Sequence, residues 1–255
     1  MQTVEFKVAG KMYACQVPDR WADITPRQFA IFAGCIAGDT ELIDPDTVRR
    51  ILDIPDVVAV NLTISDWYFL EETIHWMLDL DSYTTTALPF VTLADGTECH
   101  GFADDFSDVT WEEWTIADSQ ANAGRWDIVA AVMYRHIKPN WDRHSDPRVE
   151  FNKWDSESRL AAMQALGTDT LAAVALNYKL LRHQLTRRFK RLFTPAGTGS
   201  KGGGTNLGSL IRNVMGDNFF EEEKYLKLPV PSVLFQLDRM VREEKERKRH
   251  ERKTN

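Results

Sequence analysis

The sequence predicts a mainly α protein: a helical globular body with two small β-hairpins and a C-terminal helix that is amphipathic and charged. Apolar residues recur at helical spacing over most of the 255 residues, while two short segments instead alternate around a glycine turn. The composition, with 43% hydrophobic and 27% charged residues, is typical of a chain that folds around a core. The most apolar stretch, residues 29–38, is far shorter than the about 20 residues that a membrane span needs.

The N-terminal third predicts a hairpin followed by helices. Two runs of alternating apolar and polar residues, 4–8 and 13–17, flank Gly10 and are typical of a hairpin. Thr25-Pro26-Arg27-Gln28 then has an N-cap, a proline at the first helical position and a capping-box partner. We expect that helix to end at Gly38, a shorter helix over 45–52, and a third helix that begins at Ser65.

A second hairpin is expected over residues 88–102, around Asp95-Gly96. Thr110 and Glu113 predict a capping box, and Thr168 predicts the cap of a long helix. The expected helices of this region cover residues 111–123, 126–136, 156–166 and 168–193. Trp67 and Trp126 are at core spacing, whereas Trp111 and Trp114, three residues apart on an acidic helix, are candidates for an interface or for the core.

The composition divides the chain into a helical body over 1–194, a glycine-rich linker over 195–206 and a helical, basic C-terminal segment over 207–255, with a short helix near 207–215. The last helix is expected to begin at Ser232 and to run to about residue 249. Its apolar stripe is the candidate partner-binding site and consists of Val233, Leu234, Leu237, Met240 and Val241. Two destinations remain open for this stripe: the chain's own body, or another chain, which is either a second copy or an apolar client.

Charge is distributed unevenly along the sequence. Residues 1–181 carry 14 Lys and Arg against 29 Asp and Glu, whereas residues 182–255 carry 17 against 9. Four basic residues near the end of the long helix form an alternative nucleic-acid-binding site: Arg187, Arg188, Lys190 and Arg191. The structural alternative is that they stabilise the C-terminal end of that helix through its dipole.

Motifs for catalysis or for metal binding are absent from the sequence. Residues 197–202 match G-x-G-x-x-G, but no strand precedes them, so the segment indicates a linker rather than a phosphate site. The three cysteines have no metal-ligand or disulfide spacing, which favours reduced thiols. We therefore expect no metal, no cofactor and no catalytic residue, and a protein that is not an enzyme. The N-terminus lacks a secretory signal pattern, so we expect a cytoplasmic protein with no membrane partner.

Several segments of residues 1–185 together resemble the tail assembly chaperones and small tail-module proteins of tailed bacteriophages. These are the opening hairpin and the segments Trp21-Ala-Asp-Ile-Thr-x-x-Gln-Phe29, Leu88-Pro-Phe90, Trp111-Glu-Glu-Trp114 and Ile128-Val-Ala-Ala-Val-Met-Tyr-Arg-His136. The resemblance implies a non-enzymatic helical protein of the host cytoplasm that keeps an apolar tape-measure protein soluble during tail morphogenesis. Its alternatives are a structural or connector subunit of the virion, and the nucleic-acid-contacting protein described above.

Overall fold

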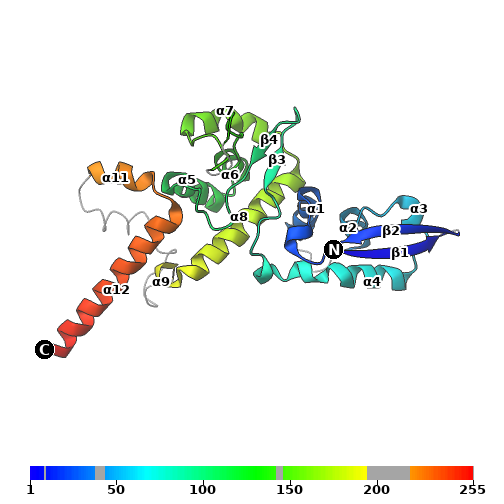
Figure 1. The fold of residues 1–255 in the computed structure, drawn as a ribbon, viewed down its shortest axis with the longest axis horizontal. Helices are drawn as coiled ribbons and strands as arrows, with labels where there is room; N and C mark the ends of the chain where they lie inside the picture. Colours follow the sequence, from blue (N-terminus) through cyan, green and yellow to red (C-terminus); the bar gives the residue numbers. More distant parts are fainter. Residues whose placement is uncertain (9, 38–43, 142–145, 194–218, 255) are drawn as a thin grey trace.

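The computed structural model describes residues 1–8, 10–37, 44–141, 146–193 and 219–254 (Figure 1). It confirms a mainly helical fold with two small β-hairpins and a C-terminal helix. Helices form most of the molecule, and the strands of the described ranges make two separate two-stranded antiparallel sheets. The molecule is elongated, with the N-terminal hairpin near one end and the C-terminus near the other. Within the described ranges, no helix combines the length and the apolar character needed to cross a membrane.

The N-terminal hairpin forms as predicted, from β1 (Gln2–Val8) and β2 (Lys11–Val17). Val4 pairs with Cys15 in its register, and Gly10 adopts a φ of +79°, which glycine tolerates best. Val8, Cys15 and Val17 turn one side of the hairpin toward the core.

Four helices follow the hairpin: α1 (Pro26–Ala37), α2 (Pro45–Ile51), α3 (Asp56–Ala59) and α4 (Ile64–Ile74). Three of these four helices begin at a side-chain cap, and α3 does not. The backbone N–H of Thr25 donates to Gln28 Oε1 at 2.9 Å, as the predicted capping box requires. The predicted start of α4 at Ser65 is wrong by one residue, because Thr63 and Asp66 form a capping box there. Three 3₁₀ turns complete the region: η1 (Trp21–Asp23), η2 (His75–Leu78) and η3 (Leu80–Ser82).

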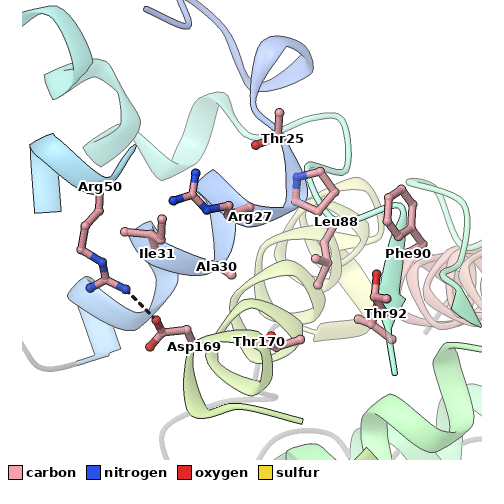
Figure 2. Close-up of a pocket in the computed structure, with 12 residues that line it drawn as sticks. Thr25, Arg27, Ala30, Ile31, Arg50, Leu88, Phe90, Thr92, Asp169 and Thr170 are labelled. Atoms are coloured by element: carbon pink, nitrogen blue, oxygen red, sulfur yellow. Dashed lines mark hydrogen bonds and ion pairs between the residues drawn. The ribbon is translucent and has the colours of Figure 1, made fainter. Parts of the chain in front are cut away.

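The centre of the molecule is α8 (Thr168–Arg188), which packs against α1 and α6 (Figure 1). Its N-cap is Gly167 without a side-chain hydrogen bond, so the predicted Thr168 cap is wrong. A Cβ atom at Gly34 would lie 2.7 Å from Asp169 Oδ1, so glycine permits the close approach of α1 and α8. Arg50 of α2 pairs with the same carboxylate at 3.0 Å, which ties the N-terminal helices to α8 (Figure 2).

The second hairpin shortens one predicted helix. It consists of β3 (Phe90–Thr92) and β4 (Glu98–His100), as expected. The helices that follow are α5 (Trp111–Asn122), α6 (Trp126–Met133) and α7 (Lys153–Gln164), and α6 contacts both of the others. The prediction that α6 continues to His136 is wrong, because Arg135 is extended and pairs with His100. The two backbone hydrogen bonds between them measure 2.7 and 2.9 Å.

The C-terminal elements are α9 (Lys190–Phe193), α11 (Phe219–Leu226) and α12 (Val230–Thr254). The predicted single helix over 168–193 is wrong, since Phe189 leaves the helical conformation and separates α8 from α9. The predicted last helix begins at Val230, two residues before Ser232. The expected linker over 195–206 and the expected helix near 207–215 lie outside the described residues.

Candidate protein-binding groove

The stripe of the C-terminal helix packs on the chain's own body. Val233, Leu234 and Leu237 are almost completely buried, and α12 contacts α5 and α9. The segment just before α12 also pairs with the start of α5, where the backbone N–H of Trp111 donates to the carbonyl of Leu228 at 2.8 Å. In the structure, these three residues therefore pack on the chain's own body, which is the first of the two expected destinations.

The other two stripe residues are less covered. Met240 is 37% exposed, and Val241 is partly buried against the core. Binding of a partner by the five stripe residues stays a prediction, and it requires α12 to leave the position that the structure gives it.

The four basic residues of the alternative nucleic-acid site do not form one free cationic face. Arg187 lies 3.4 Å from Asp81, and Arg191 lies 3.5 Å from Asp238 of α12. The Arg188 guanidinium lies 5.3 Å from the ring centroid of Phe235, and Lys190 is exposed on the other side of the break at Phe189. Two of the four charges are thus partly neutralised within the chain, and nucleic-acid binding by this set stays a prediction.

The tryptophans of α5 belong to the core and not to an interface. Trp111 and Trp114 are both buried, with ring centroids 4.8 Å apart. The helices α11 and α12 pack on α5 beside them. Trp67 and Trp126, which are at core spacing in the sequence, are only half-buried.

A cluster of charged residues lies buried where α5, α6 and the segment 146–149 meet. The Arg148 side chain donates to the carbonyls of Met133 and Asp108 and pairs with Asp146 at 2.9 Å. Arg135 pairs with Glu113 at 2.8 Å, and burial raises the pKa of that carboxyl although Arg135 opposes the shift. Arg135, Arg148 and Glu113 are buried, whereas Asp108 and Asp146 are 17% and 24% exposed. The ion pairs and the bonds to the two carbonyls hold the segment 146–149 against α5 and α6, although Arg135 Nε makes no hydrogen bond.

A cysteine and a histidine lie close together at the second hairpin. The Cys99 thiol lies 3.8 Å from His136 Nδ1, but Cys99 is fully buried and burial raises its pKa, which keeps it in the unreactive thiol form. Cys15, Cys35 and Cys99 form no disulfide with one another in the structure. Among the described residues, no three His, Cys, Asp or Glu side chains are grouped so that they would hold a metal ion.

One cleft of about 570 Å³ lies between α1, the first turn of α8 and β3 (Figure 2). Its charged side chains already have partners: Arg50 pairs with Asp169, and Arg27 lies 3.2 Å from Asp53. The cleft therefore offers a substrate or an anion no unpaired charge among these residues.

A groove of about 480 Å³ between α2 and α4 differs from this cleft because its walls are mostly apolar. Seven residues line it: Asp44, Pro45, Val48, Ile64, Trp67, Tyr68 and Glu71. Ile64 is 75% exposed and Tyr68 is 68% exposed. Large apolar side chains that gather in this way around a concave surface are typical of protein-binding sites.

The apolar side chains are exposed because α4 already uses its opposite side for the core. Leu70 and Ile74 are fully buried there. The groove was not predicted from the sequence, which indicated only that a helix begins at Ser65. The available signal was the run Trp67-Tyr68-Phe69, because three consecutive aromatic residues point in three directions around a helix and cannot all face one core.

Comparisons of this chain with protein-family models, with curated proteins and with solved structures give no match.

Proposed function

We propose that this chain is a non-enzymatic protein that binds an apolar helical segment of another protein, as a tail assembly chaperone does for its tape-measure client. The observation that carries the proposal is the apolar groove between α2 and α4, with Ile64 and Tyr68 exposed at its rim. An amphipathic helix that lays its apolar face in such a groove would remove these side chains from water. The resemblance of residues 1–185 to tail assembly chaperones supports the same function.

The groove is a more suitable binding site than the α12 stripe because it needs no rearrangement. Val233, Leu234 and Leu237 are covered by the chain itself, whereas Ile64 and Tyr68 are open to solvent. A client therefore gains the burial free energy of the groove without first displacing a helix of the chaperone.

A neutral amphipathic peptide of leucine and serine, labelled with a fluorophore, is a defined probe for this function. We expect saturable binding in an anisotropy titration, and at least a tenfold weaker affinity for Ile64→Glu. The expected loss follows because the variant places a charge where apolar surface is buried, and about 1.4 kcal/mol corresponds to tenfold. Ile64 is the first residue of α4, where a glutamate is favourable for the helix, so the variant should fold.

Met12→Glu is the matched control, since Met12 is also an exposed apolar residue but lies on the N-terminal hairpin. It should bind the peptide as the wild type does. Equal affinities for the wild type and Ile64→Glu, or no saturable binding at all, would refute the proposed function.

A second experiment separates a chaperone from a structural subunit of the particle. A chaperone leaves the finished assembly, whereas a subunit stays in it. We expect the chain in extracts of infected or induced cells and not in purified particles, as judged by mass spectrometry of both. Its presence in particles at stoichiometric amount would contradict the chaperone function.

A further inference from the structure

The region that forms the groove is strongly acidic. Residues 44–82 contain nine Asp and Glu but only two basic residues, Arg49 and Arg50. Both arginines are engaged within the chain: Arg49 pairs with Asp46 and Asp56, and Arg50 pairs with Asp169. Arg27 and Arg187, from outside this segment, pair with Asp53 and Asp81. The other five acidic side chains have no arginine partner among the described residues: Asp44, Asp66, Glu71, Glu72 and Asp79.

The two carboxylates that line the groove have different roles. Asp44 caps α2 and accepts hydrogen bonds from the N–H groups of Asp46 and Thr47 and from the Thr47 hydroxyl. These bonds, with that of the hydroxyl first, hold the pKa of Asp44 below its usual range. Glu71 is half-buried, and in the part of the chain that the structure describes it makes no hydrogen bond and no ion pair.

A carboxylate that loses its water in an apolar groove costs free energy unless a cation reaches it. An isolated protein tolerates Glu71 because water still reaches the groove. An apolar helix that covers Trp67 and Tyr68 would remove that water, and the carboxylate would then need a lysine or an arginine from the helix.

We infer that the partner of the groove is a cationic amphipathic helix, whose apolar stripe contacts Ile64, Trp67 and Tyr68 and whose flanking lysine or arginine pairs with Glu71. This inference rests on the proposed function and specifies in addition that the client is positively charged. The acidic surroundings also speed the encounter with a positively charged helix, and salt weakens that effect.

Three labelled amphipathic peptides test the inference, all with the same leucine pattern and with lysine, serine or glutamate on the polar face. The wild type should bind the lysine peptide about three- to tenfold more tightly than the serine peptide, and the glutamate peptide most weakly. The Glu71→Gln variant keeps the size of the side chain and removes its charge, so it should lose most of the preference for lysine over serine.

Glu72→Gln is the matched control, because Glu72 is the exposed neighbour of Glu71 and does not line the groove. It should keep the preference. A preference that survives in Glu71→Gln would come from the general charge of the region and would overturn the pairing that we infer.

The outcomes separate this inference from the proposed function. One outcome is that all three peptides bind with equal affinity and that Ile64→Glu abolishes this binding. The proposed function then stands, and the inference of a cationic partner is wrong. A second outcome is that no peptide binds, and that the apparent molecular mass in sedimentation rises with protein concentration for the wild type but not for Ile64→Glu. In that case the groove binds a second copy of the chain, and both proposals are wrong.

Discussion

Truncation of Leu234 to alanine tests whether α12 is part of the folded body. Leu234 is fully buried and lies beside Val233 and Leu237 in the seam between α12 and the body. Substitutions of this kind at buried sites cost about 2.7–5.0 kcal/mol, through the lost transfer of the side chain and the cavity that remains. A helix at the end of the chain can shift to fill part of that cavity, so we expect a loss of about 3 kcal/mol in the free energy of unfolding.

The matched control is Met240→Ala, six residues further along the same helix. Met240 is 37% exposed, so its truncation should cost about 1 kcal/mol or less. Alanine is the strongest helix former, so neither variant weakens the helix itself, and the difference between them reports packing. Urea unfolding followed by tryptophan fluorescence and by circular dichroism measures both losses, because Trp111 and Trp114 lie in the helix on which α12 packs.

The free energy of unfolding that Leu234→Ala can remove has an upper limit, which is the free energy with which α12 docks on the body. A larger destabilisation would release the helix while the rest of the body stays folded. Hydrogen exchange of the α12 amides detects that release directly. Equal stabilities of the wild type, Leu234→Ala and Met240→Ala would refute the reasoning, because α12 would then be undocked in solution and its stripe would be available to another chain.

Two further predictions concern α1 and α6. In Gly34→Val, the new side chain meets Asp169 at a distance that no Cβ atom tolerates and displaces it from Arg50. We expect a loss of about 1–3 kcal/mol in urea unfolding, and unchanged stability would contradict the close approach of α1 and α8. In α6, hydrogen bonds from Arg125 lower the pKa of Asp127 to about 2. Ionised Asp127 thus stabilises the fold above its unfolded pKa of about 3.9, and this contribution is lost as the pH falls toward 2. Because Arg125 is half-exposed, we expect Asp127→Asn to cost only about 1 kcal/mol at pH 7, and the difference from the wild type should disappear near pH 2. A difference that is independent of pH would exclude the ion pair as its cause.

Some features of the fold were predictable because they depend on residues only a few positions apart. The capping boxes of Thr25 with Gln28 and of Thr110 with Glu113 are of this kind, as are the turns at Gly10 and Gly96. A side chain that satisfies a backbone N–H three residues away does so in almost any tertiary context. Sequence reasoning therefore located most helices and both hairpins.

The end of α6 shows where such reasoning stops. Apolar periodicity continues past Met133, but Arg135 pairs with His100, which is 35 positions earlier in the sequence. The break at Phe189 is similar, because Phe189 is buried and its ring meets the ring of Phe235 of α12 edge to face. In each case a contact between distant segments overrides the local preference for a helix, and no pattern within a short window contains that contact.

From the sequence it follows that the last helix has an apolar stripe over Val233–Val241 and that Trp67, Tyr68 and Phe69 are consecutive in a helix. Which of these apolar surfaces is covered depends on the packing of distant segments. Leu234 is buried by α5 and α9, whereas Ile64 and Tyr68 stay in solvent because Leu70 and Ile74 already bury the other side of α4. The free energy of burial depends on what packs against a side chain and not on the side chain alone, so the groove became visible only when the segments were brought together.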